Sequence, residues 1–484
     1  MSDTHAQTVP FVRDTMLPPA APPVREAGAV RWLRANLFSG PVNTVLTVLG
    51  VLIVWFVVSH FWDWIAHSVW NANSLSECRR IIADTWGEGA RGACWAVIRE
   101  RWNQYVFGFY PPALYWRPTM AFGLLFVALT PVLFSASVFI RRVVLVLTTV
   151  LTLWAMAALG APAAWLAFAA VVTIGALAVS ERRVSWLLAF SVLYPLMAAW
   201  FLWGGSAWGP VMVLMGPVLG WIAWRLLSGL SPLLAAVAAL LVPVLWWLLF
   251  AGPAARDAGA LVSLAIPAVA SDRFGGFLLS ITIGVSGIAM SLPLGIVLAL
   301  ARRSDMFLVK SLAVIFIEFI RGVPLIALLF VASLLLNYFL PPGTTFDIIL
   351  RVIIMVTLFA SAYMAEVIRG GLAALPKGQY EAADALGLDY WKAQRLIVLP
   401  QALKISIPGI VSTFIGMFKD TTLVTFVGLY DPLKSMSDAV RASTSWKGIY
   451  WEPYIFVGAI FFLICFGMSR YSMHLERRLA RDHS

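Results

Sequence analysis

Residues 379–403 read QYEAADALGLDYWKAQRLIVLPQAL and separate two long apolar stretches of the chain. The first half is rich in good helix formers, and its two acidic side chains lie three residues apart on one helix face. Gly387 can adopt the positive φ that ends a helix, and Asp389 can cap a second helix, which we expect to stop near Pro400. The stretch therefore predicts two short helices beside a membrane, in a form that another protein can hold.

The composition of the whole chain is that of a membrane protein. Of its 484 residues, 61% are hydrophobic and 12% are charged, whereas ordinary soluble chains carry about 25% charge. The formal net charge is +11, but the Lys and Arg residues stand in short clusters beside apolar spans, where the positive-inside rule places them. We therefore expect an all-α polytopic membrane protein without a nucleic-acid partner.

Apolar stretches and basic clusters together predict twelve transmembrane helices. The first is 43–61, and six more fall between 118 and 250, where Arg clusters alternate with Gly/Pro turns. Five further spans are expected near 277–300, 308–338, 347–368, 403–428 and 453–471. With both termini in the cytoplasm, every basic cluster then falls on the expected side.

These spans divide the chain into segments with different expected roles. They are a disordered cytoplasmic tail (1–40), the first transmembrane helix (41–61), a Trp-rich periplasmic insertion (62–117), a six-helix extension (118–250), a periplasmic linker (251–273), a five-helix C-terminal domain (274–471) with the polar loop 376–402, and a cytoplasmic tail (472–484). The N-terminal tail is not expected to be a cleaved signal peptide, because no apolar run follows a basic start there. The extension has almost no polar side chain for a solute, which favours scaffolding or contact with a partner subunit.

The three cysteines are too few for a metal cluster or a disulfide scaffold, so no metal site is expected. Cys465 lies inside the last apolar span and reads as a packed small residue. Cys78 and Cys94 both fall in the insertion. In an oxidising periplasm a disulfide between them is favoured over two free thiols.

The polar loop resembles the "EAA" loop of bacterial ABC importer permeases. The match consists of Glu381, Ala382, Ala383, Gly387, Ile397, Leu399 and Pro400, with three residues between Ala383 and Gly387 and nine between Gly387 and Ile397. An ordinary amphipathic helix at the membrane surface is the alternative. The resemblance implies a type I importer core whose loop couples to a cytoplasmic ATPase through Glu381, Ala382, Ala383, Asp384, Gly387, Leu399 and Pro400.

Three further segments narrow the resemblance to the polar amino acid permeases. They are EFIRGVPL at 318–325, AEVIRGG at 365–371 and KDTTLV at 419–424, in which Thr422 replaces the usual Ser. The long N-terminal extension with its Trp-rich insertion resembles the larger permease subunit of the general L-amino acid systems of alphaproteobacteria.

This resemblance implies a permease subunit of an ATP-driven importer that carries L-amino acids, with broad specificity, across the bacterial inner membrane. Implied partners are a second permease, two ATPase subunits and a periplasmic amino acid-binding protein. The chain has no G-x-x-x-x-G-K-[ST] motif, so ATP and Mg²⁺ are expected on the partner ATPase and no cofactor on this chain, which is not an enzyme itself. The alternative is a secondary transporter driven by an ion gradient, which offers no reason for the EAA spacing.

The expected substrate pathway combines one helix face with intramembrane charges. Residues 413, 416, 417 and 420 share a face by helical spacing. Asp420 can accept hydrogen bonds from a substrate ammonium, and Thr413 or a helix terminus can serve the carboxylate. The full candidate set is Thr413, Gly416, Met417, Asp420, Thr421, Glu318 and Arg321.

Purely structural alternatives are open for each of these charges. Lys419 and Asp420 can pair to pin the span, and Glu318 and Arg321, three residues apart, can neutralise each other. Glu366 and Arg369 have the same spacing near the cytoplasmic boundary. By the resemblance, Gly416 and Thr413 contact the substrate, and an uncharged pair there suggests broad or neutral specificity.

Overall fold

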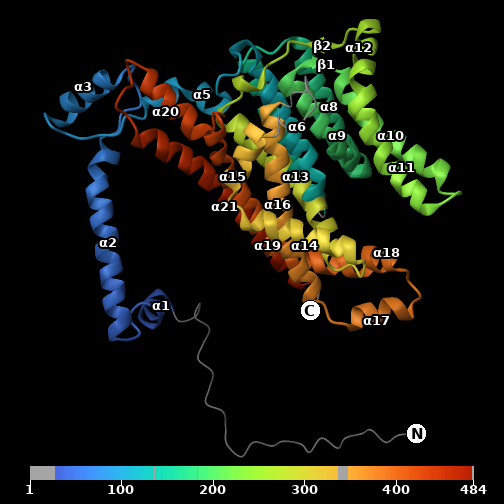
Figure 1. Cartoon of the computed structure of the whole chain (residues 1–484). Coiled ribbons are helices and arrows are strands. Elements are labelled where there is room, and N and C mark those ends of the chain that lie inside the picture. The colour runs from blue at the N-terminus through green and yellow to red at the C-terminus, as the bar shows by residue number, and fades with distance from the viewer. Residues whose placement is uncertain (1–27, 136, 183, 336–346, 482–484) are drawn as a thin grey trace, which may run out of the picture. The chain divides into compact units, whose positions relative to one another are not determined.

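The computed structural model describes residues 28–135, 137–182, 184–335 and 347–481 (Figure 1). These described residues form two compact units, one made of 28–72 together with 76–95, and one made of 73–75 together with the described residues from 96 to 481. Residues 1–27 of the expected N-terminal tail, the end of the expected span 308–338 from residue 336 on, and the last residues 482–484 lie outside the described residues.

The first unit carries α1 (Gly28–Asn36), α2 (Pro41–Ala66) and all but the first residue of α3 (Leu75–Trp86). Pro41 begins α2, where its missing N–H is no loss. After α2 the chain returns on itself: the backbone N–H of Val69 donates to Ala93 at 2.8 Å. A disulfide between Cys78 and Cys94 joins α3 to this return, so the segment after α2 is a small closed lobe.

The second unit holds the other elements. In chain order they are α4 (Ala96–Glu100), α5 (Trp102–Phe107), η1 (Pro112–Leu114), α6 (Trp116–Leu133), α7 (Val138–Ala158), α8 (Ala163–Arg182), α9 (Val184–Trp203), β1 (Gly205–Ser206), α10 (Trp208–Leu227), α11 (Pro232–Leu245), η2 (Trp246–Phe250), α12 (Ala251–Leu261), β2 (Ala265–Ile266), η3 (Ser271–Arg273), α13 (Gly276–Arg302), α14 (Phe307–Gly322), α15 (Leu325–Phe330), η4 (Val331–Leu335), α16 (Ile348–Ala373), α17 (Gly378–Ala385), α18 (Tyr390–Ala393), η6 (Gln394–Val398), α19 (Leu399–Asp420), η7 (Thr421–Val427), α20 (Pro432–Ala442) and α21 (Trp451–Arg481). β1 and β2 pair antiparallel.

The prediction of about twelve membrane-crossing helices is confirmed. In the described part of the chain, eleven helical segments are long and apolar enough to span a bilayer, and the bent pair α14 and α15 makes twelve. The bend is 104° and falls at the residues between Gly322 and Leu325, where Pro324 lacks the N–H that would continue the helix.

The extension ends later than the sequence boundary at 250. The apolar segment that contains α11 runs through η2 and α12 to Leu261. Alanine is the commonest residue in 251–261, and its high helix propensity continues the helix into the segment that was expected to be a periplasmic linker.

A buried arginine anchors the extension. The Arg117 side chain is fully buried, its Nε donates to the Phe201 carbonyl at 2.7 Å and its Nη1 donates to the Pro267 carbonyl at 2.7 Å. A carbonyl oxygen can partly replace the water that a buried cation loses. Arg117 thereby ties the start of α6 to the end of α9 and to the strand after α12.

One hydrophobic core joins the extension to the C-terminal bundle. Met120 and Leu124 of α6 and Phe201 of α9 belong to the same buried cluster as Leu278 of α13 and Val352 of α16. The extension and the bundle are therefore packed as one body, not as two domains in series.

α13 lies beside α16 and α19 (Figure 1), and small residues on α13 let these helices approach closely. A Cβ at Gly295 would lie 2.6 Å from the Cβ of Met364 on α16, and one at Gly284 would lie 2.8 Å from the Phe418 ring on α19. Helices in membranes associate through such packing, because lipid tails are as apolar as Leu side chains. The seam fixes α13 against both α16 and α19.

The disulfide generates a direct chemical prediction. Full-length protein that is denatured without reductant should take up one maleimide tag, at Cys465, and three tags after reduction. Closing a loop of this size stabilises the lobe by about 3 kcal/mol in the chain-entropy model. Mass spectrometry counts the tags, with Cys465→Ser as the control that should take up none and then two. Three tags without reduction would contradict the bond.

Candidate functional site

The polar loop folds as one short helix, α17, followed by the start of a second helix, α18, with the break at Gly387 that the sequence predicts. Gly387 has φ +67°, its N–H donates to the Asp384 carbonyl at 2.9 Å, and the Leu388 N–H donates to the Ala383 carbonyl at 3.2 Å. This is the Schellman arrangement that ends a helix. Only a glycine adopts this φ without strain, so Gly387 sets the angle between α17 and α18.

Asp389 begins the second helix. Its side chain accepts the Lys392 backbone N–H at 2.9 Å, and its other oxygen lies 3.0 Å from the Lys392 ammonium. The hydrogen bond from the Lys392 N–H, with that lysine's side chain, lowers the pKa of the Asp389 carboxyl below its ordinary value. The cap is charged at neutral pH.

The prediction that the second helix stops near Pro400 is wrong. α18, η6, α19 and η7 form one continuous helical segment that runs from Tyr390 to Val427. η6 is a π-helical turn directly before α19, and Pro400 lies in the first turn of α19. A wider turn there accommodates a residue without an N–H, so the proline shapes the helix without ending it.

The seven candidate coupling positions divide into anchors and exposed residues. Ala383 is buried, and Leu399 packs against the buried cluster around Val398 and Ala402. The others are exposed: Glu381, Ala382, Asp384, Gly387 and Pro400.

Two large apolar side chains that the sequence reading missed share this surface. Leu386 is 72% exposed and Trp391 is 70% exposed. Apolar side chains rimmed by charges are typical of a protein interface. In the sequence, Leu386 directly precedes the helix-ending Gly387 and Trp391 lies in the first turn after the Asp389 cap. These positions could have indicated that both side chains belong to an interface.

Two contacts tie α17 to the bundle. The Tyr380 hydroxyl accepts a hydrogen bond from Arg303 at 2.9 Å, and the Arg303 guanidinium also lies 5.5 Å from the centre of the Tyr380 ring. The Gln401 amide of α19 donates to the Gln379 side chain at 2.9 Å. The first contact reaches the end of α13 and the second reaches α19.

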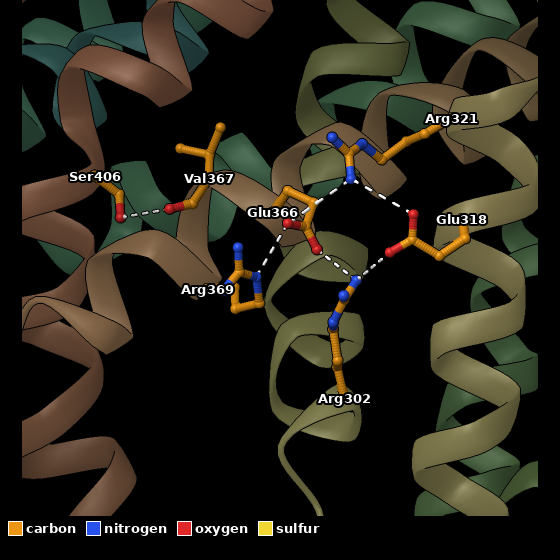
Figure 2. A network of polar contacts seen from close by, with 7 residues as sticks. All are labelled: Arg302, Glu318, Arg321, Glu366, Val367, Arg369 and Ser406. Carbon is orange, nitrogen blue, oxygen red and sulfur yellow. Dashed lines mark hydrogen bonds and ion pairs between the residues drawn. The ribbon is translucent and has the colours of Figure 1, made fainter.

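Close to this anchor lies a cluster of five charged side chains (Figure 2). Arg302 of α13 contacts Glu318 of α14 at 2.9 Å and Glu366 of α16 at 2.6 Å. Arg321 lies 3.7 Å from Glu366 and 4.0 Å from Glu318, and Arg369 lies 3.0 Å from Glu366. The i, i+3 pairs expected from sequence are both present. Arg302, which the sequence reading took for a topology signal, merges them into one network.

The candidate substrate face on α19 is only partly assembled as expected. Thr413, Gly416 and Asp420 are half-buried, and a Cβ at Gly416 would meet nothing within 4 Å. The Thr413 hydroxyl donates to the Gly409 carbonyl at 2.9 Å. In the described part of the chain, no basic nitrogen lies within 4.0 Å of the Asp420 carboxylate, so the structure has no ion pair between Lys419 and Asp420.

The other four candidates lie elsewhere. Met417 and Thr421 are buried against α13, where Met417 approaches Gly287 and the Thr421 methyl approaches Gly284. Glu318 and Arg321 belong to the ion cluster near α17, whereas Asp420 ends α19, about 30 Å along that helix from Leu399 at 1.5 Å per residue. The structure therefore does not bring the seven residues into one site.

The described residues contain no group of three or more His, Cys, Asp or Glu side chains arranged to hold a metal ion. The chemistry that this surface offers is recognition by charge, hydrogen bond and apolar contact.

Comparison with known proteins adds the family. Residues 291–481 match the model of the family described as "Binding-protein-dependent transport system inner membrane component". The chain is 57% identical, over all 484 residues and the full length of both proteins, to the glutamate/glutamine/aspartate/asparagine transport system permease protein BztC of Rhodobacter capsulatus.

Two other relatives extend the comparison. The inner membrane amino-acid ABC transporter permease protein YhdY of Escherichia coli is 33% identical over 95% of this chain and 96% of its own length. The probable glutamine ABC transporter permease protein GlnP of Bacillus subtilis is 31% identical over 42% of this chain and 91% of its own length. The Rhodobacter and Escherichia coli permeases match this chain over nearly their whole length, at 57% and 33% identity. The chain therefore belongs to the amino-acid ABC transporter permeases of the binding-protein-dependent transport family.

Proposed function

We propose that this chain is the permease subunit of an ATP-driven importer for acidic amino acids and their amides, working with a second permease, two ATPase subunits and a binding protein. The capped segment α17–α18 carries the proposal. It places Leu386 and Trp391 on an exposed polar surface while Ala383 anchors its inner side. The substrate class rests on the name of the Rhodobacter relative, with which the whole chain aligns.

The mechanism follows from what the segment can do physically. The segment forms no covalent bond with the substrate. A short helix, α17, joined by a fixed turn to the start of a long helix can transmit a displacement. ATP and Mg²⁺ bind the partner ATPases, whose closure displaces α17–α18. Because α17 is tied to α13 and α18 continues into α19, that displacement moves the helices that line the pathway. The permease pair then turns outward and receives the amino acid from the binding protein.

The half-buried face of α19 supports a substrate contact. Asp420 has no basic partner within 4.0 Å in the part of the chain that the structure describes, so its carboxylate is available to the ammonium that every amino acid carries. Thr413 contributes a hydroxyl on the same face. Gly416 leaves open space between them, which suits side chains of different shape.

The proposed location is the bacterial inner membrane with both termini and α17 in the cytoplasm. Two features support it. The basic cluster at 302 and 303 adjoins α17, as the positive-inside rule expects. Cys78 and Cys94 form a disulfide in the lobe after α2, which fits an oxidising periplasm.

Uptake measurements test the function itself. Liposomes that contain this chain with its partner subunits and binding protein should accumulate labelled glutamine only with ATP on the α17 side. Unlabelled glutamate, aspartate and asparagine should compete. Collapsing proton and sodium gradients should change little. Gradient-driven uptake without ATP would instead establish the secondary-transporter alternative.

Gly387 offers a matched pair of substitutions. Neither Gly387 nor Gly378 has an atom within 4 Å of an added Cβ, but only Gly387 has a positive φ. Gly387→Ala should therefore strain the turn by about 1–2 kcal/mol, a factor of roughly 5–30 in the population of the coupled geometry. Amino acid carried per ATP hydrolysed should fall within that range. Gly378→Ala should leave the ratio unchanged, and equal behaviour of the two variants would count against the turn's role.

The Asp389 cap generates a pH dependence. Its folded pKa is depressed, so the cap is stabilising above the carboxyl's ordinary pKa of about 3.9 and loses this effect as pH falls through the lower folded value. Hydrogen exchange of the Lys392 amide, corrected for intrinsic rate, should show an acid loss of protection. Asp389→Asn should keep protection without an acid limb, because an amide oxygen caps without titrating. Asp389→Ala should lose protection at every pH. An acid limb in the Asn variant would assign it to another group.

A further inference from the structure

The last turn of α13 ends in two consecutive arginines that reach two different parts of the molecule. Arg302 contacts Glu318 on α14 and Glu366 on α16. Arg303 donates to the Tyr380 hydroxyl on α17 at 2.9 Å and to the Leu372 carbonyl at the end of α16 at 3.3 Å. One helix end thus touches both the coupling helix and the ion cluster.

In the ion cluster, two arginines share the same two carboxylates (Figure 2). Arg302 and Arg321 each lie within 4.0 Å of both Glu318 and Glu366, at 2.9, 2.6, 4.0 and 3.7 Å. Guanidinium groups present several donors in a plane and can hold two carboxylates at once. If α14 shifts against α16, each arginine can keep one partner while it changes the other. Such a network stabilises two positions of a helix rather than one.

The two carboxylates are held to different degrees. The Glu366 side chain is 16% exposed and contacts three arginines, whereas the Glu318 side chain is 54% exposed. α13 and α16 are locked by the Gly295 seam. α14 ends at the 104° bend before α15, where a change of angle needs few backbone changes. α14 is therefore the element most free to move within the cluster.

We propose that Arg303 and Arg302 are positioning residues that transmit the displacement of α17, through Tyr380 on one side and Glu318 on the other, to α14 and its bend. We call this path the arginine relay. The inference deepens the proposed function and rests on it, because the displacement comes from the partner ATPase. Glu318 and Arg321 were expected to line the substrate pathway. In this proposal they instead control the movement of α14 that opens and closes the pathway.

A static anchor is the competing explanation of the same contacts. Anchoring charges would contribute to assembly and stability, and their contributions at separate contacts would add. In a relay the losses do not add, because interrupting one contact already removes the effect of the next contact along the path. Arg302, next to Arg303 in the chain, contacts Glu318 directly at 2.9 Å, so the dependence of Arg303 and Glu318 on each other distinguishes the two explanations.

The experiment measures amino acid carried per ATP hydrolysed in liposomes that contain the full transporter. Arg303→Gln and Glu318→Gln should each lower the ratio about tenfold, inside the 5–150-fold range typical of coupled sites. The double variant should fall no further than either single variant, whereas independent roles would multiply to about a hundredfold. Arg302→Lys keeps the charge but cannot span both carboxylates, and it should also lower the ratio while assembly with the ATPase is retained.

Two variants serve as controls. Tyr380→Phe removes only the hydroxyl and keeps the ring under Arg303, so it should lower the ratio less than Arg303→Gln. Lys434→Gln breaks a pair of similar exposure with Asp438, 2.9 Å apart and outside the cluster, and should leave the ratio unchanged.

The outcomes distinguish a failure of the arginine relay from a failure of the proposed importer function. Absence of ATP-dependent uptake in the unaltered transporter would overturn the proposed function. Normal ratios in the variants of a transporter that does take up amino acid with ATP would overturn the relay alone. Multiplicative losses in the double variant, or loss of assembly in both Arg303→Gln and Tyr380→Phe, would assign the arginines a static role and also overturn it.

Discussion

The close approach of α13 to α16 and α19 is the constraint on which the C-terminal bundle depends. A methyl group at Gly295 or Gly284 would fall within 3 Å of Met364 or Phe418, and overpacking of this kind costs typically about 1–3 kcal/mol. In a bilayer, packing must hold helices together without help from water exclusion. The seam therefore fixes the position of the C-terminal end of α13. Through that position it places Arg302 beside Glu318 and Glu366, and Arg303 beside α17.

Local signals in the sequence predicted the parts of this structure that local physics controls. Bilayer thickness sets the length of each apolar stretch, so the number of spans followed from composition and basic clusters. Gly387 and Asp389 act within a few residues of themselves, and both the turn and the cap formed where they were expected. The resemblance of the loop to the EAA loop of ABC importer permeases predicted the family to which the chain belongs.

Contacts between helices that are distant in the chain could not be predicted from local sequence patterns. Arg302 is 16 residues from Glu318 and 64 from Glu366, and nothing in a periodic pattern says that three helix ends will converge. The helical wheel grouped Met417 with Asp420, but the α13 seam buries Met417. Pro400 misled for a related reason, since the rule that proline ends a helix omits the π-turn that accommodates it.

The single core shared by the extension and the bundle has a consequence for how such a protein can evolve. A gene shortened to begin near residue 274 would encode helices whose buried faces, including Leu278, Ile283 and Val352, now border lipid. Insertion would survive, because acyl chains accept those side chains, while the rigidity that comes from shape complementarity would be lost. Loss of the extension would thus require new side chains on one wall of the bundle, which makes such a loss difficult.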